Sequence, residues 1–309
     1  MALAPTRHTL FAVKVGATTL KQMQSTRLSS GANKLLAFGD GMVDPTYATT
    51  NPAEPRFEFS GTAIAAMLNA VGISGLGLAT GSVLDMWWQK RAQRGTLAPS
   101  ASAVHRKRTI TNGLVVPRRL NVTHGGVATL DYEVLIFGDG VNSPIIHTDN
   151  VALSGTPGVE ELFTVRPMDL NGVRYAEGIQ SYTLDFGITA MLTGGGGYQF
   201  PTHVSIGARM PVLTVRTLDA AVESLIGEAG AVALSSTNRV YLRKKAEGVG
   251  NLGDGTAEHI SFTFNKGLTL MSEGAAQHGG DAEFAGEYSP VFDGTNAIVV
   301  IDTACVIAA

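Results

Sequence analysis

The sequence predicts a mainly β protein built from two tandem copies of one domain, each a β-sandwich or barrel with one flanking α-helix. Three observations predict this fold. Residues 77–149 recur as residues 231–303 at a constant offset of 154, about half of the 309-residue chain. Short segments rich in Val, Ile, Phe, Tyr and Thr alternate with glycine turns, which is typical of many-stranded sheets. A short stretch of helical spacing also follows the same point in each half.

The repeat is strongest over residues 103–149. Shifting the chain by 154 gives 13 identities in 47 ungapped columns, where average composition predicts roughly 3 or 4. The identical residues include His105 on His259, Gly113-Leu114 on Gly267-Leu268, His124-Gly125-Gly126 on His278-Gly279-Gly280, and Asp139-Gly140 on Asp293-Gly294. A catalytic site rarely needs its whole fold twice, whereas a ring-forming subunit can use a duplicated fold directly.

The front of each copy matches less closely. Residues 11–14 resemble residues 163–166 at an offset of 152, and Pro55 falls on Pro211 at an offset of 156. An alternating segment follows each proline. The changing offset predicts insertions of a few residues in the loops of each copy.

A helical pattern follows the alternating segment, over residues 64–71 in the first copy and residues 218–226 in the second. We expect copy 1 to span residues 1–153 and copy 2 to span residues 159–309. A turn-rich linker at residues 154–158 would join them. Both copies then have a common size for a single domain.

Strand candidates occupy most of the chain. They are short and rich in β-branched and aromatic residues, and glycine-containing turns separate them. The clearest lie at residues 131–137, 144–148, 162–166, 203–207, 239–244, 261–266 and 297–302. Such a copy is a small sandwich or open barrel whose sheets have edges, and unprotected edges pair with neighbours.

Composition excludes several classes of protein. Hydrophobic residues make up 44% of the chain and charged residues 16%, which favours sizeable cores over disorder. The net charge of −3 gives no basic footprint for tight nucleic-acid binding. Cys305 is the single cysteine, so we expect folding in a reducing cytoplasm without an intrachain disulfide. We find no secretion signal and no apolar stretch of about 18 residues, so no membrane partner is expected.

The sequence contains no constellation that predicts catalysis. His124 and His278 each stand alone in a glycine turn, whereas a metal site needs two or three converging ligands. Residues 194–197 are all glycine but lack the Lys-Ser/Thr of a phosphate-binding loop, so we interpret them as a hairpin tip. We therefore expect a protein that is not an enzyme, with no catalytic residue, no metal site and no cofactor.

The order of elements at the front of each copy resembles a known family. A strand leads into a long glycine-rich hairpin or loop, at Ser29–Asn51 in the first copy and Tyr182–Gln199 in the second. A proline-initiated strand and a helix follow. This order is similar to that of the tail tube proteins of phages with long non-contractile tails. The resemblance is architectural and covers both halves of the chain.

The resemblance implies a structural virion protein. Three duplicated chains would form a homotrimeric, pseudo-sixfold ring, and stacked rings would form a tail tube that conducts DNA during genome ejection. The implied partners are further copies of the chain, other phage tail proteins and duplex DNA that passes through the lumen without specific binding. The long hairpins would make ring-to-ring contacts. The implied location is the virion tail, after synthesis in the host bacterial cytoplasm.

Simple geometry favours six domains per ring. A globule of 154 residues, half of the chain, has a diameter of about 38 Å, and six touching spheres leave a hole of about that width. Three spheres leave a hole of about 6 Å, too narrow for a duplex roughly 20 Å wide.

The alternatives to a tail tube protein are a tail terminator, a capsid decoration protein and an oligomeric carbohydrate-binding β-protein.

A DNA conduit also constrains the basic clusters. Fixed cations along a bore would hold phosphates, which would retard the passage of a duplex. We therefore expect Arg106–Arg108, Arg118-Arg119 and Lys244-Lys245 to lie in interfaces or on the outer face, with acids more numerous than cations along the lumen.

Overall fold

The computed structural model describes most of the chain. The described residues are 8–16, 18–20, 22–71, 84–90, 105–151, 161–219, 221–222, 230–234, 237–248, 250–276, 278 and 281–307, without the side chains of 8–12, 84–90, 105 and 150. This part of the chain is mainly β, with several sheets and one short helix, which confirms the predicted fold class at that level. The predicted linker and most of the helical pattern at 218–226 lie outside the described residues.

The first half forms two layers that share one apolar core. One layer has the strand order β11-β8-β7-β1-β2, with β1 (His8–Val15), β2 (Thr18–Leu20), β7 (Leu84–Lys90), β8 (His105–Ile110) and β11 (Ile145–Val151). The other has the order β3-β6-β10-β9, with β3 (Met23–Ser29), β6 (Arg56–Gly61), β9 (Gly113–Thr123) and β10 (Thr129–Ile136). Helix α1 (Ile64–Val71) buries Ile64, Met67, Leu68 and Val71, as its helical spacing predicts.

The second half also has two layers. One has the order β13-β12-β19-β21-β24, with β12 (Phe163–Leu170), β13 (Val173–Tyr175), β19 (Asn238–Ala246), β21 (His259–Phe264), β24 (Val300–Cys305), and β20 (Gly250–Asn251) beside β19. The other has the order β14-β17-β23-β22-β18, with β14 (Ile179–Asp185), β17 (Val212–Thr217), β18 (Val232–Leu234), β22 (Gly267–Ala275) and β23 (Glu283–Pro290).

The two halves share strand order and register. The order β11-β8-β7-β1-β2 corresponds to β24-β21-β19-β12-β13, and β3-β6-β10-β9 corresponds to β14-β17-β23-β22. Irregularities recur as well. The register of β3 against β6 shifts between Met23 and Ser25, and that of β14 against β17 shifts between Ile179 and Ser181, 156 residues later. The pairing pattern of the first half is therefore repeated in the second.

Strand pairing corrects the offset predicted at the front of each copy. Val13 of β1 pairs with Met86 of β7, and Met168 of β12 pairs with Val240 of β19. Strand β1 thus corresponds to β12 at an offset of 155, and the predicted offset of 152 is wrong. Two apolar strands still resemble each other when one is shifted by a few residues along the other. Sequence similarity alone therefore aligned β1 with β12 at the wrong offset.

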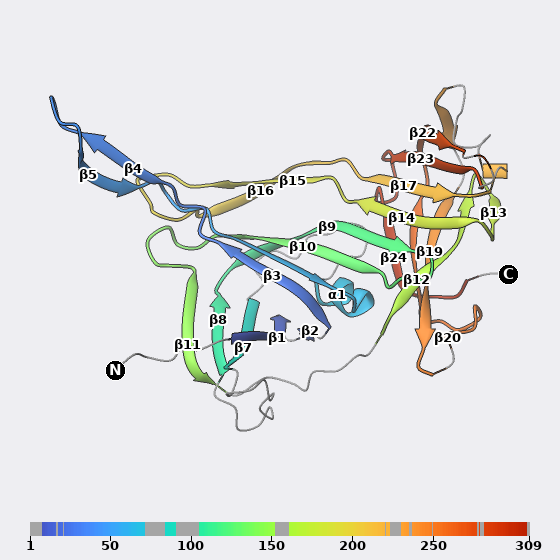
Figure 1. The fold of residues 1–309 in the computed structure, drawn as a ribbon, viewed down its shortest axis with the longest axis horizontal. Helices are drawn as coiled ribbons and strands as arrows, with labels where there is room; N and C mark the ends of the chain where they lie inside the picture. The colour runs from blue at the N-terminus through green and yellow to red at the C-terminus, as the bar shows by residue number, and fades with distance from the viewer. Residues whose placement is uncertain are drawn as a thin grey trace.

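One continuous sheet joins the two halves. Strand β9 pairs antiparallel with β14, so the order β18-β22-β23-β17-β14-β9-β10-β6-β3 runs through nine strands (Figure 1). In two separate sandwiches both strands would be edges with unpaired backbone groups. The sequence predicted edges that pair with neighbours, but it did not predict that the two copies pair with each other.

A long hairpin extends from each half. The first consists of β4 (Lys34–Phe38) and β5 (Pro45–Thr50), and the second of β15 (Ile188–Thr193) and β16 (His203–Arg209). The first projects from the body at the upper left of Figure 1, whereas the second runs along the first half. The prediction of the second hairpin at residues 182–199 is wrong in its bounds. Tyr182 is buried in β14, and residues 194–197 lie at the tip, so the returning strand comes later.

Tyr132 and Tyr182 offer a matched test of buried hydroxyl groups. Burial raises the pKa of both phenols. The Tyr182 hydroxyl donates to the carbonyl oxygen of Arg166, whereas the Tyr132 hydroxyl has no partner among the described residues. We expect Tyr132→Phe to raise the free energy of unfolding by up to about 1 kcal/mol and Tyr182→Phe to lower it by about 1 kcal/mol. Urea unfolding of the two variants measures the difference, and equal changes would contradict this prediction.

Candidate functional site

The seam, defined as strands β9 and β14 with the side chains around them, joins the two halves. At one end the Phe186 amide donates to the Arg118 carbonyl over 3.0 Å, and at the other the His124 amide donates to the Gln180 carbonyl over 2.7 Å. Bonding direction alternates along an antiparallel strand. Even-numbered residues of β14 therefore direct their backbone groups toward β9, and odd-numbered residues direct theirs toward β17.

Charged side chains reinforce the seam. The Arg118 guanidinium contacts the buried Glu133 carboxylate and also donates to the carbonyl oxygen of Ile188 in the second hairpin. Arg119 Nη2 lies 3.5 Å from Asp185 Oδ2 on the opposite strand. The basic pair Arg118-Arg119 thus lies where the halves meet, and charge-assisted hydrogen bonds there favour one relative position of the two sheets.

A second contact between the halves lies at helix α1. The Ala66 amide, in the first turn, donates to Glu161 Oε1 over 2.9 Å. Gln22 Nε2 donates to the Glu161 carbonyl over 2.9 Å, and Thr303 Oγ1 lies 3.0 Å from Asn69 Oδ1. Amides in the first helical turn have no partner within the helix, and a carboxylate is a favourable acceptor there. A residue of the second half therefore stabilises the helix of the first.

The tip of the second hairpin docks on the first half through backbone hydrogen bonds. The phenol ring of Tyr198, at this tip, packs on Gly140, where an added Cβ would lie 2.6 Å from Tyr198 Cγ. The backbone bonds are Gln199 N to Gly140 O (3.0 Å), Phe200 N to Gly140 O (3.1 Å), Gly138 N to Pro201 O (2.9 Å) and Ala53 N to Gln199 O (2.8 Å). Only glycine fits under the ring at this position.

The seam strands and the docked hairpin each have a counterpart that is open, wholly or in part, within the described chain. Strand β3 corresponds to β14 and is the last strand of the nine-stranded sheet. Strand β22 corresponds to β9. Strand β18 pairs with its residues 267–269, and beyond them no described strand pairs with that edge. Hairpin β4–β5 corresponds to β15–β16, and within the described chain its tip makes no backbone hydrogen bond to another element.

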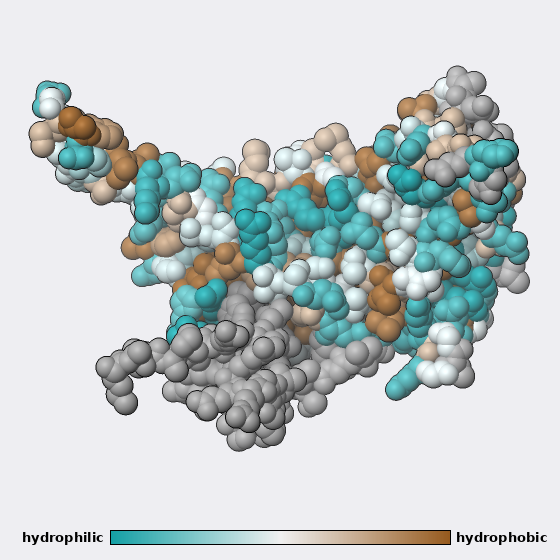
Figure 2. Space-filling view, in the orientation of Figure 1, coloured by the Kyte–Doolittle hydropathy of each residue, from teal (hydrophilic) through white to brown (hydrophobic). Residues whose placement is uncertain are grey.

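Hairpin β4–β5 exposes apolar side chains to solvent. Figure 2 shows hydrophobic residues gathered on the projecting arm. They include Leu35, Leu36, Phe38, Met42, Val43 and Tyr47, and Val43 is 92% exposed. Contiguous exposed apolar surface of this kind marks a site of protein–protein contact.

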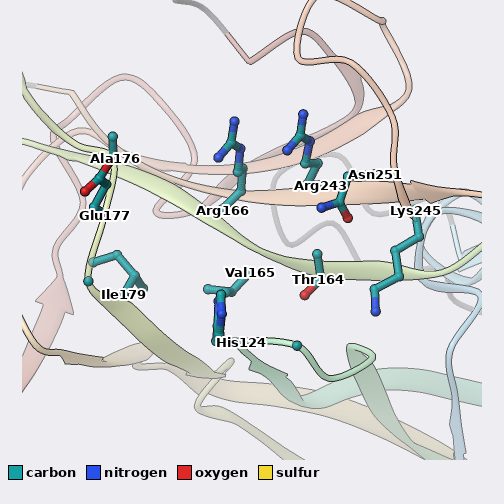
Figure 3. Close-up of a pocket in the computed structure, with 12 residues that line it drawn as sticks. His124, Thr164, Val165, Arg166, Ala176, Glu177, Ile179, Arg243, Lys245 and Asn251 are labelled. Carbon is teal, nitrogen blue, oxygen red and sulfur yellow. The ribbon is translucent and has the colours of Figure 1, made fainter. Parts of the chain in front are cut away.

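A cavity of about 380 Å³ opens beside the seam (Figure 3). His124 of the first half lines it, together with Arg166 and Arg243 of the second. Asp254 pairs with both guanidinium groups, at 3.1 Å from Arg243 Nε. Burial opposes ionisation of Asp254, but the Arg166 hydrogen bond and both positive charges outweigh it, so the pKa of this carboxyl is lowered. Because the arginines are already paired, we interpret the group as a structural ion-pair cluster.

The histidines singled out in the sequence lie in different settings. His259 is buried, its Nδ1 accepts from the Lys244 amide over 3.1 Å, and its Nε2 donates to the Gly253 carbonyl over 3.0 Å. His278 is exposed, and the His105 side chain lies outside the described part of the chain. Among the described residues, no three His, Cys, Asp or Glu side chains are grouped to hold a metal ion.

Two Asp-Gly turns have the same internal hydrogen bonds. Asp139 Oδ1 accepts from two backbone amides, and its Oδ2 accepts from Asn142 Nδ2 over 2.6 Å. Asp293 Oδ1 also accepts from two amides, and its Oδ2 accepts from Asn296 Nδ2 over 2.8 Å. In both turns these bonds to the charged form lower the pKa of the carboxyl.

We expect a pKa of about 2 for Asp293, because the Asn296 side chain and then the backbone amides stabilise its carboxylate. Since the pKa is lowered on folding, the turn stabilises the protein above the ordinary Asp value. That contribution is lost as pH falls toward about 2. Carboxyl NMR titration measures this pKa, and Asn296→Ala should raise it. An unchanged pKa in that variant would contradict the assigned cause.

Sequence comparison of the hairpins contained a signal that the prediction missed. At an offset of 156, the first hairpin and the segment after it share several glycines and prolines with the second. The matched residues are Gly31 with Gly187, Gly39 with Gly195, Gly41 with Gly197, Pro45 with Pro201, Thr46 with Thr202 and Pro55 with Pro211. Searching at this offset would have placed the second hairpin correctly.

Comparisons with known proteins add no further identification. No protein family model matches the sequence, and a search of curated proteins finds no match. Among the described helices, none has the length and apolar character needed to span a membrane.

Proposed function

We propose that the chain is a structural virion protein that assembles into trimeric, pseudo-sixfold rings, and that these rings stack into a tail tube. The observation that carries the proposal is the seam together with its unpaired counterparts. The edge strand β3 corresponds to β14, and the open part of β22 corresponds to β9. A second copy can therefore repeat the seam between chains, with its β3 beside the β22 of its neighbour.

The proposal includes a duplication of one ancestral domain. It is supported by the equal strand order of the halves and by the register shift that recurs 156 residues later. A contact between unlike surfaces of equivalent domains is heterologous, and such contacts close into a ring when the rotation permits. With two domains per chain, six domains require three chains.

The open face of the nine-stranded sheet is the proposed wall of the bore. Its opposite face is apolar and packs in the core. Acids outnumber cations among the charged residues of its strands: Glu58, Asp131, Glu133, Asp185, Glu273, Glu283 and Glu287 against Arg27, Arg56, Arg118, Arg119 and Arg216. Arg118 and Arg119, which were expected away from the lumen, belong to this sheet, but they are paired with Glu133 and Asp185, and Arg56 and Arg216 are paired as well. A weakly acidic wall would let duplex DNA pass without capture.

Native mass spectrometry and negative-stain electron microscopy of the purified protein test the proposal. We expect rings of three 32.3-kDa chains, about 97 kDa in total, and hollow tubes at higher concentration. Six chains per ring, or a monomer at high concentration, would contradict the trimer. Closed rings that never stack would favour a tail terminator over a tube protein.

A further inference from the structure

The two long hairpins have the same construction but different surroundings. In the first, the Met42 amide donates to the Gly39 carbonyl over 3.0 Å, and in the second, Tyr198 donates to Gly195 over 3.3 Å. Gly41 has a φ of +74° and its counterpart at position 197 has a φ of +77°. The second tip lies on the first half of its own chain, whereas the first projects into solvent (Figure 1).

The surface that receives the second tip also has a counterpart. Gly140 lies under Tyr198, while its counterpart Gly294 has the same left-handed conformation and open space where a Cβ would stand. The Asp139 and Asp293 turns that present these glycines have matching hydrogen bonds. The receiving surface of the second half is thus formed and unoccupied by any described part of the chain.

Side chains on this open surface complement the projecting tip. Phe292 is 61% exposed and Met210 is 66% exposed, and Arg209, which precedes Met210 in the chain, is also exposed. In the docked hairpin, Phe200 and Ala53 line one shared depression. The counterpart of Phe200 is Asp44 on the projecting hairpin, and the counterpart of Ala53 is Arg209 on the second half; the two carry opposite charges.

We propose that hairpin β4–β5 docks on the second half of another copy of this chain, in the same ring, with Met42 and Val43 over Gly294. Val43 and Asp44 would donate their amides to the Gly294 carbonyl, and Pro45 would accept from the Phe292 amide. Asp44 would pair with Arg209. This inference rests on the proposed ring. It assigns the hairpin to a contact within the ring, whereas the family resemblance implies ring-to-ring contacts.

Val43→Asp tests the docking, with Val173→Asp as a matched control on β13. Both positions are exposed, at 92% and 51%, so neither substitution should unfold the chain. Burying an aspartate in place of valine should raise the concentration needed for half-assembly by about tenfold or more. Sedimentation velocity measures this concentration, and the control should leave it unchanged. Equal effects of both variants would overturn the docking.

A charge exchange identifies the neighbour. Asp44→Arg and Arg209→Asp should each raise the half-assembly concentration by about fivefold, and the double variant should restore it. A mixture of the two single variants can make two of the three contacts of a ring complementary, so partial restoration there would further support a contact between chains. If Val43→Asp and both charge reversals leave the half-assembly concentration unchanged, the docking is overturned while the proposed ring still stands. A wild-type monomer at all concentrations would overturn both.

Discussion

Thr26→Pro is expected to abolish assembly while leaving the chain folded. Thr26 of β3 corresponds to Tyr182 of β14, an even-numbered residue whose backbone groups face β9 across the seam. By the same alternation, the Thr26 amide faces away from β6. No described strand pairs with this side of β3, so proline removes a donor that has no strand partner in the described chain, and edge strands tolerate proline at such positions. In the proposed contact between chains, the proline would interrupt the hydrogen-bond ladder and place its pyrrolidine ring between the two strands. We expect a cost of about 3 kcal/mol, or about 100-fold in affinity, at each such contact.

Two further variants separate assembly from folding. Thr26→Val keeps the donor and should assemble normally. Ala276→Pro lies just beyond the opposite edge strand, β22, at the position equivalent to Val122 of β9, and it should block assembly as well. Circular dichroism and thermal unfolding report whether each variant is folded, and sedimentation reports assembly. Normal assembly of both proline variants in a folded state would rule out strand pairing through these edges.

Local features of the fold were predictable because they depend on neighbouring residues. The apolar spacing at Ile64, Met67, Leu68 and Val71 predicted helix α1, whose residues are buried as expected. Short β-branched segments between glycine turns predicted several of the strands, among them β10, β12, β16, β19 and β21. The fold class follows from these local preferences, which packing reinforces.

The seam was not predictable in the same way. Strands β9 and β14 have the composition of any half-buried strand, and their pairing depends on how the second half folds back on the first. The contact between Arg119 and Asp185 joins residues far apart in sequence, and neither stands in a distinctive motif. The candidate interface needed three-dimensional positions, although the sequence repeat predicted that equivalent surfaces would exist twice.

The need for glycine at the base of each hairpin could not be predicted from the sequence either, because it comes from one close backbone contact. An added Cβ on Gly31 would lie 2.1 Å from the Glu54 carbonyl oxygen, and one on Gly187 would lie 1.8 Å from that of Met210. Both glycines have a positive φ, of +60° and +57°. Glycine is common in loops generally, so its presence in the sequence did not reveal this close approach.

Gly187→Ala should therefore destabilise the protein by about 2–5 kcal/mol. The left-handed backbone costs about 1–2 kcal/mol for alanine, and relieving the overlap with the Met210 carbonyl adds about 1–3 kcal/mol. Because that carbonyl is backbone, no side-chain rotation can make room. Gly197→Ala is the matched control in the same hairpin, with a φ of +77° and nothing within 4 Å of the added Cβ.

The control should lose only the conformational cost, about 1–2 kcal/mol, so the difference between the two variants isolates the contact at the hairpin base. Urea unfolding measures both values. Gly31→Ala has a similar overlap, with the Glu54 backbone, at the base of the projecting hairpin. We expect it to displace that hairpin and impair assembly. If Gly187→Ala and Gly197→Ala lose equal stability, the close approach at the hairpin base does not determine the need for glycine.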